Sequence, residues 1–103
     1  MLEQNAIDEL KRRHGTLREW TCSGETVIVR EPTKIAYDKF RDWQDDPIRK
    51  GSACEAFVTD CVVYPDAAGV MAMLERKPGL ADTFAIKLSI LAGNTRDVQE
   101  KKL

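Results

Sequence analysis

The sequence contains few of the residues on which enzyme active sites usually depend. Its 103 residues include a single histidine, His14, and only six glycines, none of them in a phosphate-binding motif. The histidine lies at the end of a predicted surface helix, and nothing in the sequence orients it toward a nucleophile. We therefore predict a non-enzymatic protein that requires no cofactor.

The three cysteines fit neither a disulfide framework nor a zinc site. Structural zinc ligands usually come in pairs about two to four residues apart, whereas His14, Cys22, Cys54 and Cys61 are separated by 8, 32 and 7 positions. An odd number of cysteines is also unusual for a small secreted domain. We expect packing cysteines, no bound metal and a reducing, cytoplasmic compartment.

Charge and hydropathy do not identify a partner. The 16 basic and 17 acidic residues give a formal net charge of −1, so no global field attracts nucleic acid or anionic lipid. No apolar run approaches the roughly 18 residues that a membrane span needs. At this length we expect one domain, with no membrane contact and no strong attraction for nucleic acid.

Residue patterns near the N-terminus predict a helix followed by a β-hairpin. The helix carries apolar residues at helical spacing and ends at Gly15; these apolar residues are Leu2, Ala6, Ile7 and Leu10. β-favouring residues predict strands at about 17–22 and 25–31 around a Ser23-Gly24 turn. Two strands are marginal alone, so the hairpin needs helical cover, a third strand or another chain, which includes homo-oligomerisation.

The chain after Pro32 predicts further amphipathic helices. The first of them begins near Thr33 and ends at Asp45-Asp46. The next begins at Pro47, with Asp46 as its cap, and ends at Pro65. Two more helices cover residues 67–76 and 80–92. The last is apolar on so many sides that other helices or a partner chain should enclose it.

The predicted fold is thus α+β and mainly α, a small helical bundle with one two-stranded antiparallel hairpin near the N-terminus. Residues 1–93 form the single domain, and the polar residues 94–103 form a flexible C-terminal tail because they bury too little apolar surface to offset their ordering entropy.

Large apolar residues on two of these helices are candidates for protein binding. They are Phe40 and Trp43 on the second helix and Met73 and Leu74 on the fourth. Each of them fits a packed core as well, because tryptophan pins elements together and methionine fills core space. Truncation separates the two roles, since an anchor loses binding and a core residue loses stability.

A basic cluster supports an alternative function, that of a small nucleic-acid-binding regulator. Its candidate phosphate contacts are Lys11, Arg12, Arg13, Arg18 and Arg30, with His14 and Trp20 beside them. The same charges are expected at the C-terminus of any helix, where they complement the helix dipole. We therefore keep nucleic-acid binding as the alternative.

The order of elements resembles the small tail-assembly chaperones of long-tailed bacteriophages and related prophages. The resemblance lies in the basic helix end Lys11-Arg12-Arg13-His14-Gly15, the ribbon with its Ser23-Gly24 turn, the Arg30-Glu31-Pro32-Thr33 exit and the break at Asp46-Pro47. It implies a non-enzymatic protein of the bacterial host cytoplasm that binds the tape-measure protein and tail-tube subunits while the tail assembles. It assigns no binding residues.

Overall fold

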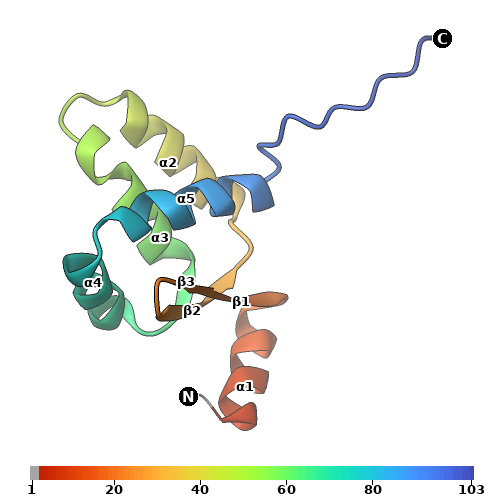
Figure 1. Ribbon diagram of the computed structural model, residues 1–103. Helices are drawn as coiled ribbons and strands as arrows, with labels where there is room; N and C mark the ends of the chain where they lie inside the picture. The colour runs from red at the N-terminus through yellow and green to blue at the C-terminus, as the bar shows by residue number, and fades with distance from the viewer. Residues whose placement is uncertain (1–2) are drawn as a thin grey trace.

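The computed structural model describes residues 3–103, which form five α-helices, one short 3-10 helix and a three-stranded sheet (Figure 1). The elements in chain order are α1 (Gln4–His14), β1 (Leu17–Cys22), β2 (Glu25–Arg30), α2 (Lys34–Asp45), the 3-10 helix η1 (Lys50–Ser52), α3 (Ala53–Cys61), β3 (Val62–Tyr64), α4 (Ala67–Arg76) and α5 (Gly79–Leu91). The prediction of a mainly helical α+β fold is confirmed. None of the helices in this part of the chain combines the length and the apolar composition of a membrane span.

The predicted hairpin is confirmed, with its second strand one residue shorter than expected. β1 and β2 pair antiparallel, with Trp20 opposite Val27. Ser23 and Gly24 both have positive φ angles, 52° and 80°, and turns of this kind match the twist of two paired strands.

The prediction of only two strands is wrong, because β3 pairs antiparallel with the free edge of β2 and places Val62 opposite Val29. The predicted helix from Pro47 to Pro65 is correspondingly too long at both ends. Its last residues, from Val62 to Tyr64, are β-favouring and gain sheet hydrogen bonds instead of helical ones. A two-stranded hairpin was expected to need helical cover, a third strand or another chain, and β3 is such a third strand.

The N-terminal end of that predicted helix is replaced by a turn. The Asp46 side chain accepts a hydrogen bond from the backbone N–H of Ile48 at 2.8 Å, so it closes a turn and does not cap a helix at Pro47. η1 follows this turn, and α3 begins only at Ala53.

The other helix boundaries follow their predicted signals. Thr33 caps α2 by accepting the Ala36 N–H at 3.1 Å, and Asp66 caps α4 by accepting the Gly69 N–H at 2.9 Å. α1 ends at His14, and Gly15 follows it with a φ of 78°, which suits glycine. Leu2, which the sequence pattern assigned to this helix, lies outside the described residues.

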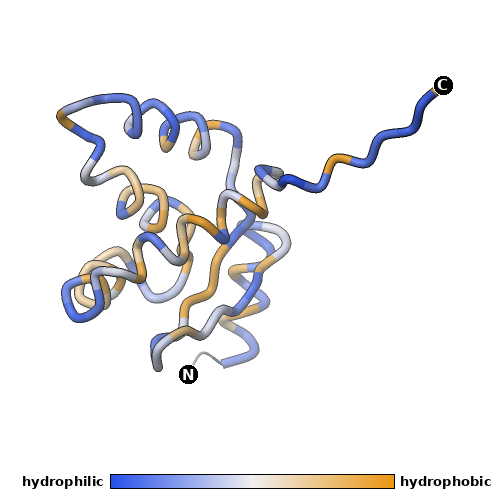
Figure 2. The backbone as a smooth tube through the Cα atoms, turned by 45° about the horizontal axis from the view of Figure 1, so that its top comes forward, coloured by the Kyte–Doolittle hydropathy of each residue, from blue (hydrophilic) through white to orange (hydrophobic). Residues whose placement is uncertain are grey.

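The main core lies between one face of the sheet and the helices α2 to α5. Trp20 of β1 stacks on Phe84 of α5 with ring centroids 5.9 Å apart, and Phe40 of α2 stacks on Phe57 of α3 at 4.4 Å. Figure 2 shows apolar chain gathered in this region, while the C-terminal segment is mainly hydrophilic. α1 contacts β1 and has no fully buried residue, so it adds little to this core.

Polar contacts fasten the sheet to the helices at both ends of β2. Glu25 at its start pairs with Arg76 at 2.7 Å and with Lys77 at 3.4 Å, and Lys77 also donates a hydrogen bond to the Ser23 carbonyl. The hydrogen bond from Arg76, with help from Lys77, lowers the pKa of the Glu25 carboxyl. Arg30 at the other end donates to the backbone carbonyl at the end of α3.

Candidate protein-binding groove

An open groove lies between α2 and α5. Both helices pack on α3 and face each other across the groove. The groove has a volume of about 440 Å³ and is lined by Tyr37, Phe40 and Gln44 of α2, Cys54 of α3, Asp82, Ala85, Ile86, Ser89 and Ile90 of α5, and Asn94 just beyond α5. We call this feature the α2–α5 groove.

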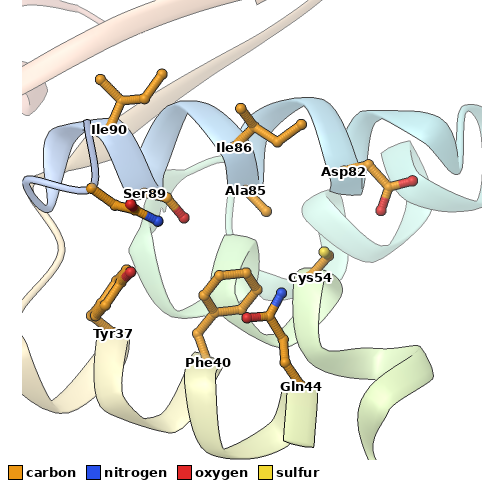
Figure 3. A pocket seen from close by; sticks show the side chains of 10 residues that line it. Tyr37, Phe40, Gln44, Cys54, Asp82, Ala85, Ile86, Ser89 and Ile90 are labelled. Carbon is orange, nitrogen blue, oxygen red and sulfur yellow. The ribbon is translucent and has the colours of Figure 1, made fainter. Parts of the chain in front are cut away.

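The floor of the groove combines apolar side chains with polar groups at defined places. Figure 3 shows Phe40 and Tyr37 facing α5, from which Ala85 and Ser89 point back toward α2. Phe40 and Ala85 are buried members of the core, so the groove floor is the outer layer of the core itself. A ligand in the groove would therefore rest on a rigid, packed surface.

Two isoleucines form the α5 rim of the groove. Ile86 and Ile90 are four residues apart, so they lie on the same side of the helix, one turn from each other. Their side chains are 65% and 51% exposed. Exposed isoleucines at the edge of a hollow are candidates for contact with another polypeptide, because large exposed apolar side chains often mark interaction sites.

Asp82 and Cys54 mark the end of the groove farthest from Asn94. Burial raises the pKa of the Cys54 thiol, and the neighbouring Asp82 carboxylate raises it further. The thiol therefore stays protonated at neutral pH and is a poor nucleophile. Asp82 is the charged residue that lines this groove, so a cation on a ligand has a partner at this end.

The four residues predicted to bind protein do not form one surface. Met73 and Leu74 are buried in the core, and Phe40 is 7% exposed and contributes only to the groove floor. Trp43 is half-buried on another side of α2, where it lines a smaller hollow with Met71. Of the four, Phe40 is thus the residue that lines the α2–α5 groove.

The predicted nucleic-acid contacts are largely engaged with other groups. Arg12 and Arg13 both pair with Glu9, at 2.5 and 3.3 Å, and Arg18 pairs with Glu31 at 3.5 Å. These ion pairs offset positive charge that a phosphate backbone would need.

Arg30 is half-buried and donates a hydrogen bond to the Asp60 carbonyl at 2.9 Å, whereas Lys11 is exposed on α1. Three of the five basic residues therefore form surface ion pairs, Lys11 is exposed, and Arg30 makes a structural hydrogen bond.

The residues considered for a metal or a nucleophile are also dispersed. Within residues 3–103, no three His, Cys, Asp or Glu side chains come together in a group that could hold a metal ion. Cys61 is fully buried, and burial raises the pKa of its thiol to about 11. All three cysteines are free thiols in the structure.

The sequence pattern includes Ile86 only as one of the apolar residues of the last helix, and it does not identify Tyr37 or Ile90 as groove residues. A usable signal existed in α5, whose apolar residues surround the helix instead of forming a single stripe. That pattern predicted cover by helices or by a partner chain. The structure shows that other elements of the chain cover only part of this surface.

The structure is a small α+β domain, mainly helical, with an open groove on its helical side. The chain belongs to the family described as DUF6848, a domain of unknown function, which matches residues 18–101. A solved structure described as uncharacterised protein rbstp2171 from Bacillus stearothermophilus shares the fold with a TM-score of 0.77 and 20% identity, over 92% of this chain and 99% of that chain. No match was found among curated proteins.

Proposed function

We propose that this chain is a non-enzymatic, protein-binding adaptor of the phage or prophage tail-assembly chaperone kind. Its clients are the tape-measure protein and tail-tube subunits, which it binds in the cytoplasm of the bacterial host. The α2–α5 groove receives an apolar helix face of the client, in the helix-in-groove mode of recognition. The observation that carries this proposal is the pair of exposed isoleucines, Ile86 and Ile90, beside an open groove whose floor includes Phe40 and Ala85.

The chemistry of the groove specifies the kind of client segment. The isoleucine rim and the Phe40 floor favour an amphipathic helix with large apolar residues at intervals of three or four. Asp82 favours a lysine or arginine on that helix near one end of the apolar stripe. A long tape-measure protein made of repeated helical segments offers many such faces, so modest affinity at each suffices.

Co-purification tests the proposal. The chain is co-expressed with the tape-measure and tail-tube proteins of the tail-gene cluster in which the proposal places its gene. The wild type should retain one or both, and Ile86→Asp or Ile90→Asp should weaken retention roughly tenfold or more, because a buried charge replaces an apolar anchor. Both variants should keep the wild-type melting temperature, since surface substitutions usually change stability by less than about 0.5 kcal/mol.

Ile48→Asp is the matched control, because Ile48 is 92% exposed and does not line the groove. This variant carries the same chemical change and should retain the clients as the wild type does. Equal retention by Ile48→Asp and loss by Ile86→Asp supports the groove as the binding site. Absence of retention by the wild type, or a gene that lies among metabolic genes, refutes the chaperone function.

A further inference from the structure

The C-terminal tail begins at the mouth of the α2–α5 groove. Asn94 lines the groove, and every residue from Ala92 to Leu103 is exposed, with no helix or strand assigned after α5. Figure 1 shows this segment extending away from the helices. It carries two apolar side chains, Val98 at 86% exposure and Leu103, which is fully exposed.

We propose that the tail folds back along the α2–α5 groove and acts as an internal competitor of the client. This inference rests on the proposed function of the groove and adds its regulation. In the closed form Val98 lies against Ile86, and the two lysines of the tail, Lys101 and Lys102, lie near Asp82. The client displaces the tail, and the extended tail of the structure represents the open form.

The length of the tail matches the length of the groove. The tail from Asn94 to Val98 spans about 13 Å when extended, because each residue contributes about 3.3 Å. Along α5, the rise from Ile86 to Asn94 is about 12 Å at 1.5 Å per residue. Glycine adopts other backbone angles at little cost, so a reversal of the chain at Gly93 would bring Val98 level with Ile86.

The charge at the Asp82 end of the groove supports the same register. Asp82 lies about 18 Å from Asn94 along the helix, at 1.5 Å per residue. Lys101 reaches about 23 Å when the tail is extended, so the flexible lysine side chains can return to the Asp82 carboxylate. No ion pair involves either lysine within the part of the chain that the structure describes.

The family match provides a separate argument. It extends through Lys101 and thus includes most of the tail, together with the sheet and the helices α2 to α5. A segment that the shared domain pattern contains is part of the domain and not an appended linker. If the tail occupies the groove, this otherwise exposed polar segment helps to cover the surface of the domain.

A weak contact is sufficient for closure because the tail is tethered. A short flexible tether gives an effective concentration on the order of 1 mM. A tail with a free dissociation constant of about 1 mM would then occupy the groove about half of the time, and a roughly ninefold tighter contact would raise this fraction to about nine-tenths. Loss of closure should therefore raise the apparent affinity for a client by about two- to tenfold.

Methyl NMR of the full-length chain tests closure without any client. The wild type should show a nuclear Overhauser contact between the methyl groups of Val98 and Ile86. In Val98→Asp this contact is lost, and the Ile86 and Ile90 methyl resonances should shift. Gln99→Asp is the matched control, because it adds the same charge one position away, where an extended chain points to the other side. Its isoleucine resonances should remain those of the wild type.

Identical Ile86 and Ile90 resonances in the wild type and Val98→Asp would overturn the proposal. A mixture of two differently labelled samples distinguishes closure within one chain from exchange between copies. An Overhauser contact between the labels would assign the tail to the groove of a second copy, and would overturn closure within the chain. A contact seen only within one copy supports it.

Client binding separates this inference from the proposed function. The tape-measure protein should bind Val98→Asp about two- to tenfold more tightly than the wild type, while Ile86→Asp should lose binding. If Ile86→Asp loses binding and Val98→Asp is unchanged, the groove binds clients and the tail does not regulate it. If Ile86→Asp binds as the wild type does, the proposed function itself fails.

Discussion

Phe40 lies where the core meets the groove, so its replacement distinguishes a structural role from a binding role. The side chain is 7% exposed, and its ring stacks on Phe57 with an interplanar angle of 14° and a centroid distance of 4.4 Å. Tyr37 packs beside both rings, with centroid distances of 6.3 and 6.1 Å. This aromatic cluster joins α2 to α3, so we expect Phe40→Ala to act mainly on stability.

The size of the effect follows from the burial of the ring. Replacing a buried phenylalanine with alanine typically costs about 3–5 kcal/mol, because burial free energy is lost and a cavity remains. A chain of this length has a free energy of unfolding of about 5–15 kcal/mol. At roughly 4 °C or more per kcal/mol, the melting temperature should fall by at least about 12 °C.

Urea unfolding followed by circular dichroism measures this loss directly. Phe40→Ala should shift the midpoint to lower urea without changing the slope, which would show that the native state alone is destabilised. Phe40→Leu is the control, because it keeps most of the apolar volume and should cost less than about 1.5 kcal/mol. A loss below about 1 kcal/mol in Phe40→Ala, together with lost client binding, would refute the packing argument and make Phe40 an anchor.

Three further predictions concern polar and thiol groups. Because the folded-state pKa of Glu25 is lowered, its stabilising effect is present above the pKa of an unfolded glutamate and is lost as the pH falls through the folded value. Urea midpoints of the wild type and Glu25→Gln should therefore differ at pH 7 and converge as the pH falls below the lowered folded-state pKa of Glu25; a constant difference would contradict this. Cys61, whose pKa is about 11, should resist iodoacetamide at pH 8 in the native protein and react after unfolding, as peptide mass spectrometry would show; native alkylation would contradict its burial. Arg30→Met should lower the free energy of unfolding by about 1.5–3 kcal/mol, because the charged hydrogen bond to the Asp60 carbonyl is lost; unchanged stability would show that this contact is dispensable.

Elements that depend on local chemistry could be predicted from the sequence. Ser23 and Gly24 can adopt positive φ angles, and Thr33 and Asp66 offer oxygens to the free N–H groups of a helix start. These preferences act over three or four residues, so the sequence contains them in full. The hairpin, the start of α2 and both ends of α4 were predicted for this reason.

Elements that depend on distant contacts could not be predicted in the same way. Val62 continues the apolar stripe of α3, so helical periodicity includes it in the helix. It leaves the helix because Val29, more than thirty positions earlier in the chain, has an unpaired backbone edge. A short run of β-branched residues is ambiguous between helix and strand until its partner is known.

The site raises the same difficulty, because periodicity identifies an apolar face but not what covers it. α2 and α5 have 12 and 13 residues, whereas α3, on which both of them pack, has only nine. At about 1.5 Å per residue, the two outer helices are roughly 5 Å longer than their common support. The α2–α5 groove lies between these two longer helices, with the exposed side chain of Ile90 on its α5 side. Closing this groove within the domain would require a longer α3 or an additional segment. The nearest additional segment is the tail that leaves α5 at Asn94, so a client helix and the tail would compete for the same uncovered surface.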